Sequence, residues 1–361
     1  MKNGKKIQVL KLYPNVIPVR GYNRSLLVDL LKGMPYFVPN ALIDSLKEGS
    51  EEACSEYDEF ILKHELGIHV SPEIGAGLTP LPLDYYPASK INNAILELDE
   101  QSSWDVCSAL DQLDELGAQF LEVRFLDYPS VEKNLEPIFG CLRDSTIEFL
   151  QILVPFHEDL KQFLDAKLQE RFFRLGTIVV YNAPTGFELR NNDYNLVFTS
   201  QESVTHEQCG TISAHSFVIH TEAYVRNRNY NSCLAHKISI DKDGLICNCP
   251  SVTARYGHLN VTTFQDVLMR QSFRESWNLT KDRVPVCSVC EFRWICADCR
   301  AFTIDDLANG KPSKCGYNPF ISLWAGEEGY LPEDQCGVVL NGEEMKVDHE
   351  LIGKINQKLW N

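Results

Sequence analysis

INNAILEL (91–98), AQFLEVRFL (118–126) and IEFLQILV (147–154) are three apolar stretches, each typical of a β-strand. Amphipathic segments at 103–116 and 131–143 separate them and are predicted to be helices. Alternation of this kind produces βαβ units, whose strands pair in parallel while the helices cover the sheet. The sequence therefore predicts an α/β fold with a parallel sheet or a partial barrel.

The alternation continues beyond residue 154. A helix is predicted at His157–Glu170, followed by a strand at GTIVVYNA (176–183). The stretches YNLVFTS (194–200) and SFVIH (216–220) are weaker candidates for further strands. Beyond residue 231 the chain breaks into short segments between cysteines, with one helix predicted at Thr263–Trp277.

The first 80 residues predict a separate small α+β unit. Short β-like runs stand at KIQVLKLY, SLLVDLL and PYFVP, and two helices are expected at Asn40–Glu48 and Glu51–His64, with Pro39–Asn40 as break and cap. The Pro- and Gly-rich stretch Val70–Pro87 is typical of a linker. We therefore expect domains at 1–80, 88–225 and 226–361.

Composition narrows the class of protein. The chain has 361 residues, 44% of them hydrophobic, and a formal net charge of -16, so it is globular and would be repelled by a phosphate backbone or an anionic membrane. No apolar run approaches the ~18 residues of a membrane span, and no signal peptide is recognisable. We expect a cytoplasmic protein without nucleic-acid or membrane partners.

Cysteine content points to metal binding. There are 13 cysteines, an odd number that is high for a reducing compartment and argues against a disulfide framework. Cys54, Cys107 and Cys141 are scattered singly, as structural cysteines often are. The other cysteines are concentrated in the C-terminal region, whose weak apolar periodicity calls for stabilisation by metal.

Seven of these cysteines follow in a definite order: Cys233, Cys249, Cys287, Cys290, Cys296, Cys299 and Cys315. A CxxC pair lets two thiolates reach one metal from a single turn. Structural zinc accepts four ligands, and zinc ribbons separate their CxxC pairs by about 15–20 residues, whereas only five residues separate Cys290 from Cys296. Two [4Fe–4S] clusters are the leading interpretation, with zinc as the alternative.

The order Cys233…Gly244…Cys249, followed by CSVCEFRWICADC and Cys315, resembles the SPASM domain of radical SAM enzymes. That resemblance implies two auxiliary [4Fe–4S] clusters. The family commonly has three residues between the last two cysteines of the central run, whereas only Ala297 and Asp298 stand there in this chain. We also asked whether Arg293 and Arg300, which adjoin the cysteines, offset the negative charge of a cluster or lie in solvent.

The resemblance further implies a crossed ligation. One cluster would be held by Cys287, Cys290, Cys296 and Cys315. The other would be held by Cys233, Cys249 and Cys299, and its fourth ligand is left open between Cys209, Cys247 and none. Cys336 is expected to be a bystander.

The motif of the catalytic radical SAM cluster is missing. Residues after INNAILEL read DEQSSWDVC, and CxxxCxxC occurs nowhere in the chain. The central region thus resembles a radical SAM core that has lost its reactive centre, and no cleavage of S-adenosylmethionine is expected. No Gly-rich phosphate-binding loop is present either.

Longer stretches resemble the peptide maturases of "grasp-with-spasm" gene clusters, among them NYNSCLAHKISIDKDGLICNCP and VCSVCEFRWICADCRAF. The resemblance implies a precursor peptide made by the ribosome and an ATP-grasp ligase as partners. It also implies that residues 1–80 form a small winged-helix-like unit that takes a leader peptide at a strand edge.

Two classes of function stay open at this point. The chain is either a binding protein whose clusters support its structure, or a redox enzyme that acts on the peptide through a cluster with an open iron. A zinc-stabilised binding protein is the third possibility. Whether the chain catalyses any step is left undecided by the sequence.

Overall fold

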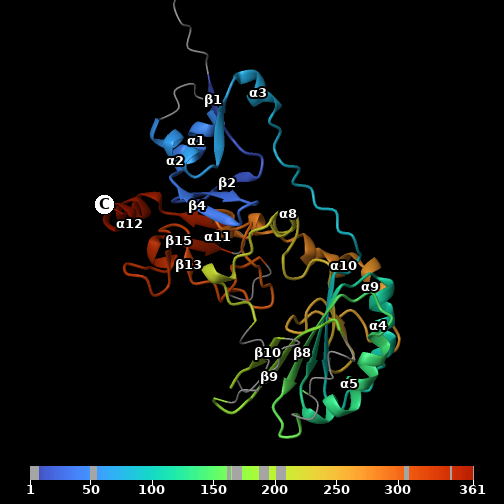
Figure 1. Cartoon of the computed structure of the whole chain (residues 1–361). Helices are drawn as coiled ribbons and strands as arrows, with labels where there is room; N and C mark the ends of the chain where they lie inside the picture. Colours follow the sequence, from blue (N-terminus) through green and yellow to red (C-terminus); the bar gives the residue numbers. More distant parts are fainter. Residues whose placement is uncertain are drawn as a thin grey trace, which may run out of the picture.

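The computed structural model describes residues 8–48, 55–160, 164, 173–186, 195–200, 209–304, 309–341 and 344–360. Its centre is a 7-stranded sheet in the order β10-β9-β8-β7-β6-β11-β12, shown in Figure 1. Its strands are β6 (Asn93–Leu98), β7 (Phe120–Phe125), β8 (Phe149–Pro155), β9 (Leu175–Tyr181), β10 (Asn195–Phe198), β11 (Lys237–Ile240) and β12 (Ile246–Cys247). All neighbours are parallel except β11 and β12, so the predicted α/β fold with a parallel sheet is confirmed.

Two helices cover one face of this sheet. They are α4 (Val106–Glu115) and α5 (Tyr128–Leu142), close to the predicted bounds, and both lie along the same side in Figure 1. Asp105 and Asp127 cap their first turns by accepting hydrogen bonds from backbone N–H groups. The helix predicted at 157–170 lies mostly outside the described residues.

Alternation along the strands sets the two faces of the sheet apart. Leu96, Val123 and Ile152 point to the helices and belong to the largest apolar core. The residues that alternate with these on the same strands point to the other face of the sheet. They include the ion pair of Glu97 and Arg124. Strand β11 joins this sheet beside β6, although Lys237 of β11 pairs with Asn93, which lies 144 residues earlier in the chain.

The N-terminal unit contains two small sheets. Strand β1 (Val9–Leu12) pairs with β5 (Gly67–Val70), and β2 (Val16–Arg20), β3 (Ser25–Asp29) and β4 (Met34–Val38) form the other sheet in that order. Helices α1 (Asn40–Glu48) and α2 (Ser55–Lys63) pack against them, and α3 (Pro72–Gly77) follows. The expected α+β character is confirmed.

Three details of this unit differ from the sequence prediction. Strand β2 was not predicted, because Pro18 interrupts its pattern, yet Pro is tolerated here on an edge strand. The expected cap role of Asn40 is wrong, because its amide donates to the Tyr22 carbonyl at 2.9 Å and its oxygen accepts from Ser25. The predicted linker contains α3, after which the chain runs without helix or strand to β6.

The C-terminal region is built from short elements. They are η1 (Ala214–Ser216), α8 (Thr221–Asn229), α9 (Phe264–Met269), α10 (Gln271–Arg274), η2 (Glu275–Asn278), η3 (Lys281–Arg283), α11 (Pro285–Ser288), β13 (Tyr317–Asn318), β14 (Leu323–Trp324), η5 (Asp334–Cys336), β15 (Val338–Asn341), β16 (Glu344–Val347) and α12 (His349–Trp360). The strand predicted at 216–220 is wrong, because His220 caps α8 instead. The single helix predicted at 263–277 is wrong too, because the chain breaks at Arg270, whose backbone is extended.

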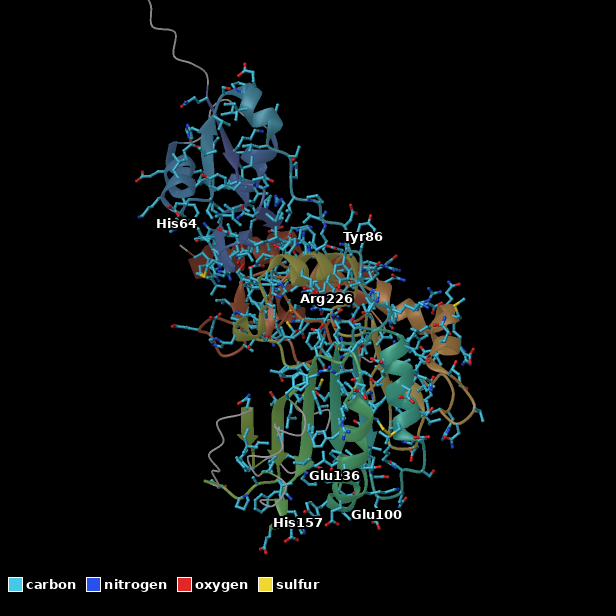
Figure 2. All side chains as sticks on the ribbon, turned by 45° about the vertical axis from the view of Figure 1, so that its right-hand side comes forward. His64, Tyr86, Glu100, Glu136, His157 and Arg226 are labelled. Carbon is cyan, nitrogen blue, oxygen red and sulfur yellow. A yellow bond between two sulfur atoms is a disulfide. The ribbon has the colours of Figure 1, made fainter. Side chains whose placement is uncertain are left out.

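The N-terminal unit packs on the C-terminal region. Arg24 forms an ion pair of 2.8 Å with the buried Glu291, and the Tyr22 hydroxyl lies 2.5 Å from Nδ1 of His349. Figure 1 shows β4 and α12 close together at this junction. The linker runs beside α8, where Asn229 donates to the Leu83 carbonyl at 2.7 Å, and Tyr86 projects outward in Figure 2.

One prediction about the scattered cysteines is wrong. Cys107 of α4 and Cys141 of α5 form a disulfide that ties the two helices together, visible as the yellow bond in Figure 2. The spacing of 34 residues gave no sign of this, because the two positions meet only once both helices pack on the sheet. Cys54 lies outside the described residues. No helix in the described part of the chain is long and apolar enough to cross a membrane.

Candidate metal centres

The first group of thiols comes from the central cysteine run and from Cys315. Cys287 lies in α11, and the N–H of Cys290 donates to its carbonyl at 3.0 Å, which closes a tight turn around the CxxC pair. Cys287 and Cys296 are both buried. Phe292, Ile295 and Tyr317 form the apolar wall beside these sulfurs.

Burial and nearby charges shift the pKa values of thiols in this group. Burial raises the pKa of Cys287 to about 11 and that of Cys296 to about 12, and a Cys315 thiolate raises both further, while Lys281 acts to lower them. Burial also raises the pKa of Cys290 well above its usual value, and negative charge on Cys287 and Cys296 adds to this. The thiols of Cys287, Cys290 and Cys296 are therefore protonated near neutral pH until a metal replaces the protons.

A buried ionic network lies beside this group. Asp298 accepts hydrogen bonds from Lys281 at 3.2 Å, from Arg300 at 2.5 Å and from Asn231 at 2.7 Å. Its side chain is only 2% exposed. Asp298 is thus the central residue of the network, and it is one of the two residues between Cys296 and Cys299.

The second group gathers thiols from four separate segments: Cys209, Cys233, Cys249 and Cys299. Cys233 begins a turn in which Asn231 accepts from its N–H at 3.0 Å, and Cys249 follows β12. A Cβ on Gly210 would lie 2.8 Å from the Cys299 sulfur, so the backbone next to Cys209 touches Cys299.

Cations surround the second group. Lys237 donates to the Cys233 sulfur at 3.8 Å. Burial alone would lower the pKa of Lys237, but negative charge on Cys233 and Cys249 raises it. The pKa of Cys249 is raised by burial, while Lys237 and Arg124 act to lower it. These contacts bring the thiols to the polar face of the sheet.

Arg124 links the thiols to the carboxylates of that face. Its guanidinium contacts Glu122 at 2.5 Å and Glu97 at 3.2 Å, and Gln151 donates to Glu122 at 2.7 Å. Burial raises the pKa of Glu97, although Arg124 acts in the opposite direction. The polar face of the sheet thus carries both signs of charge.

Cys247 and Cys336 lie apart from these groups. The Cys247 sulfur donates to the Ser239 carbonyl at 3.7 Å within the sheet, and burial raises its pKa strongly. Cys336 lies in the separate apolar core of β15 and α12, where Asn318 donates to its sulfur at 3.4 Å. Neither is linked electrostatically to several other thiols.

The structure itself shows no metal site. Within the described ranges, no three or more His, Cys, Asp or Glu side chains form a group that could hold a single metal ion.

Neither Arg293 nor Arg300 lies in solvent, since both side chains are buried. Arg293 donates to the backbone carbonyls of Arg20 and Cys290 at 2.8 and 2.9 Å and thus binds the N-terminal unit to the cysteine turn. Arg300 binds Asp298. Its charge also acts on the Cys287 thiol, and three lysines act on the thiols as well: Lys237, Lys281 and Lys311. No sequence motif marks these lysines, because each lies far along the chain from some of the sulfurs it faces.

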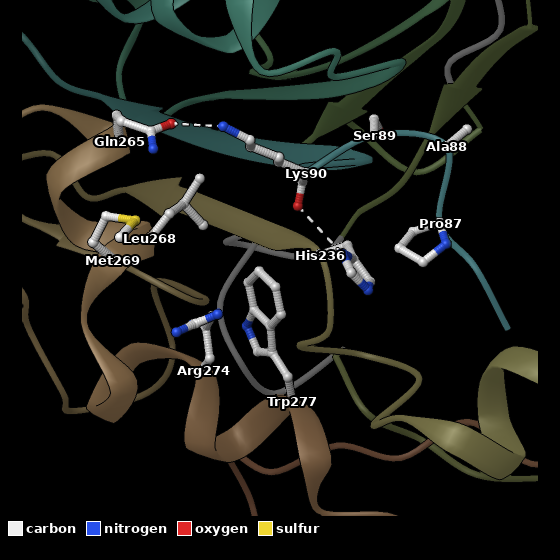
Figure 3. Close-up of a pocket in the computed structure, with 10 residues that line it drawn as sticks. All are labelled: Pro87, Ala88, Ser89, Lys90, His236, Gln265, Leu268, Met269, Arg274 and Trp277. Carbon is white, nitrogen blue, oxygen red and sulfur yellow. Dashed lines mark hydrogen bonds between the residues drawn. The ribbon is translucent and has the colours of Figure 1, made fainter.

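A pocket lies on the helix side of the loop that carries Cys233. It has a volume of about 420 Å³ and lies between the end of the linker and α9–α10. Figure 3 shows Trp277 and Arg274 on one side and Lys90 on the other, with Nδ1 of His236 donating to the Lys90 carbonyl at 3.2 Å. Its volume is suited to a small ligand or one peptide side chain.

Comparison with known proteins adds nothing to this chemistry: no protein-family model matches the chain, and no curated protein matches it. The argument about function therefore depends on the side chains themselves. The most informative of them are the two groups of thiols and the lysines beside them.

Proposed function

We propose that this chain is an iron–sulfur protein with two [4Fe–4S] clusters, and that it serves in the maturation of a ribosomally made peptide. One observation carries the proposal: the thiols separate into two groups, each with buried members, and the buried Lys281 faces the first group while the half-buried Lys237 faces the second. A buried ammonium group is costly unless an anion compensates it. Asp298 alone is shared between the buried cations Lys281 and Arg300, and a cluster with four thiolates, which carries net negative charge, would supply a further anion.

The residues fit the crossed ligation that the resemblance implies. Cys287, Cys290, Cys296 and Cys315 would hold one cluster, with Lys281 and Lys311 beside it. Cys233, Cys249 and Cys299 would hold the other, with Lys237 and Arg124 beside it. When bound, such clusters transfer single electrons or stabilise the fold.

Zinc is the weaker alternative. Structural zinc accepts four ligands, and zinc ribbons separate their CxxC pairs by about 15–20 residues, whereas only five residues separate Cys290 from Cys296. The apolar wall of Phe292, Ile295 and Tyr317 also favours a cluster, because a low-polarity shell limits access of water to it.

The proposal includes no cleavage of S-adenosylmethionine. The parallel strands β6 to β9 have the order of the first strands of a (β/α) barrel, which supports a likeness to the radical SAM core. In that core the loop after the first strand carries the catalytic cluster. In this chain the loop after β6 packs against the turn that follows β11. Ser102 and Trp104 of the loop donate hydrogen bonds to the Lys242 carbonyl at 2.7 and 3.3 Å.

The peptide partner is proposed from the resemblance and from the N-terminal unit. Strand β4 is at the edge of its sheet, and in the described part of the chain no strand pairs with its outer side. Met34 and Phe37 on β4 are 50% and 49% exposed. An exposed edge with apolar side chains can take an extended peptide by strand addition, beside an ATP-grasp ligase that performs the ligation.

A redox enzyme is the second candidate. The observation that favours it is the polar face of the sheet, where Glu97, Glu122 and Arg124 lie beside the second group of thiols. A peptide side chain bound there would meet a cluster directly. This candidate requires an iron that no cysteine occupies.

The test of the cluster proposal is the metal content of anaerobically purified and reconstituted protein. We expect about eight irons and about eight sulfides per chain, with the brown colour and broad visible absorption of [4Fe–4S] clusters. Colourless protein with stoichiometric zinc would refute it. Cys336→Ala is a matched control that should keep full iron content, whereas Cys290→Ala should lose about half.

The peptide proposal is tested by titrating the full chain with the precursor peptide encoded beside its gene. We expect a Kd below about 1 mM, with modest dependence on salt because the contacts are main-chain hydrogen bonds. Met34→Asp on β4 should weaken binding. Val261→Asp is the control, because Val261 is equally apolar and 85% exposed on the C-terminal region. Equal binding by both variants would contradict the strand-edge assignment.

A further inference from the structure

The segment from Cys209 to Ile212 passes between the two groups of thiols. Gly210 has φ +80°, and a Cβ at this position would lie 2.8 Å from both Cβ and Sγ of Cys299. Two residues later, Ile212 forms a parallel bridge with Cys315. The backbone of this segment thus contacts one cysteine of each group, and only glycine allows the approach to Cys299.

Hydrogen bonds fix the position of this segment. Lys314 donates from its ammonium group to the Cys209 carbonyl at 2.6 Å. The Ile212 N–H donates to the Lys314 carbonyl at 3.3 Å, so the same residue holds the segment at two points. Cys209 is therefore presented to the second group by a fixed backbone, next to the Cys299 sulfur.

The contact of Gly210 with Cys299 places Cys209 next in sequence to a residue that touches one of the three cysteines assigned to the second cluster. The side chain of Cys209 is half-buried, as is that of Cys233, another of the three.

Cys247 has a different environment, although it is two residues from Cys249. Its sulfur donates to the Ser239 carbonyl across the β11–β12 pair, and it is completely buried. Cys247 is thus part of the sheet, not of the thiol group.

We propose that Cys209 is the fourth thiolate of the second cluster and that this cluster consequently has no open iron. This inference rests on the proposed function, since it concerns one of the two clusters. Its consequence is functional: with every iron bound by cysteine, no peptide atom can bind to iron there. The cluster then serves in electron transfer or in holding Cys209–Ile212, Cys233 and Cys249 together, and not in direct activation of the peptide.

Mild oxidation of the reconstituted full chain tests the inference. Ferricyanide takes one electron from a [4Fe–4S]²⁺ cluster, and an iron without a thiolate then leaves as Fe²⁺, which yields a paramagnetic [3Fe–4S]⁺ cluster. We expect no such signal by electron paramagnetic resonance from the native chain or from Cys247→Ala. Cys209→Ala should give a signal equivalent to one cluster per chain.

Two results overturn the inference while leaving two clusters in place. One is a [3Fe–4S]⁺ signal from the native chain, and the other is a Cys209→Ala variant as resistant to oxidation as the native chain. Native protein without iron would instead refute the proposed function, and with it this inference. Iron content measured beforehand distinguishes the two failures.

A second measurement does not depend on any variant. The native protein is treated with iodoacetamide before and after removal of iron by a chelator, and modification of each cysteine is followed by mass spectrometry of its peptides. We expect Cys209 to be protected in the loaded protein and alkylated after chelation. Alkylation of Cys209 at the same rate in both forms would overturn the assignment.

Discussion

The ammonium group of Lys237 lies 3.8 Å from the sulfur of Cys233. Lys237 is the first residue of β11 and follows Cys233 by four residues in the chain. Its side chain lies on the polar face of the sheet. The pair joins the sheet to the second group of thiols.

Replacing Lys237 should make the second cluster harder to reduce. A positive charge next to a ligand sulfur favours the reduced, more negative cluster, so Lys237→Met should lower its reduction potential. A hydrogen bond to a charged group contributes about 1.5–3 kcal/mol, and at 59 mV per factor of ten a shift of roughly 60 mV or more follows. Lys242→Met is the control, because Lys242 pairs with Asp99 and Asp243 and no thiol. Equal potentials in both variants, measured by redox titration, would contradict the role of Lys237.

The iron-free protein should become less stable in alkali. Burial raises the pKa of Cys287 to about 11 and that of Cys296 to about 12 from a usual value of 9.0. The folded chain therefore holds these protons more tightly than the unfolded chain, and its stability is full below about pH 9 and falls as pH rises towards 11–12. The melting temperature of the iron-free protein should drop across that window. Cluster-loaded protein should show a smaller drop, because its cysteines are already thiolates; identical curves would argue against ligation by these residues.

Asp298→Asn should destabilise the C-terminal region. The substitution keeps the shape but removes the negative charge that compensates Lys281 and Arg300, both about 4% exposed. Loss of one partner from a buried ion pair costs about 3–5 kcal/mol. Urea denaturation measures the loss. Asp243→Asn is the matched control, because the Asp243 carboxylate is 65% exposed in its pair with Lys242 and should cost less than ~1 kcal/mol. A loss of similar size in both variants would contradict the network.

Reduction of the Cys107–Cys141 disulfide should destabilise the sheet domain. The bond closes a loop of 34 residues. In the chain-entropy treatment a loop of this length stabilises the folded state by up to roughly 4 kcal/mol. Cys107→Ser should abolish the difference in stability between oxidised and reduced protein. Reduction is verified by the appearance of two newly reactive thiols. If the stability of the native chain is then unchanged, the bond does not stabilise the folded state.

The parallel sheet could be predicted because its signal is local. Strands β6, β7 and β8 stand out as mostly apolar stretches, and the helices between them begin at the capping residues Asp105 and Asp127. Strand β11 was missed as a member of this sheet. Its four residues precede the Asp241–Gly244 turn, and nothing in so short a run reveals that its partner is β6, far back in the chain.

The candidate ligands could be predicted from spacing, but their surroundings could not. Turns such as Cys287–Cys290 are encoded within a few residues. The lysines at 237, 281 and 311, the anchor Asp298 and the approach of Gly210 to Cys299 depend on contacts between distant segments. The break at Arg270 could not be predicted either. Apolar residues continue at helical spacing on both sides of it, so the local pattern indicates one helix.

The most direct test of the two-cluster account is the location of iron in crystals grown without oxygen. An anomalous difference map recorded at the iron absorption edge should show two separate strong peaks per chain. One should lie among Cys287, Cys290, Cys296 and Cys315, and the other among Cys209, Cys233, Cys249 and Cys299. A map without iron peaks, or peaks that appear only at the zinc edge, would contradict the account.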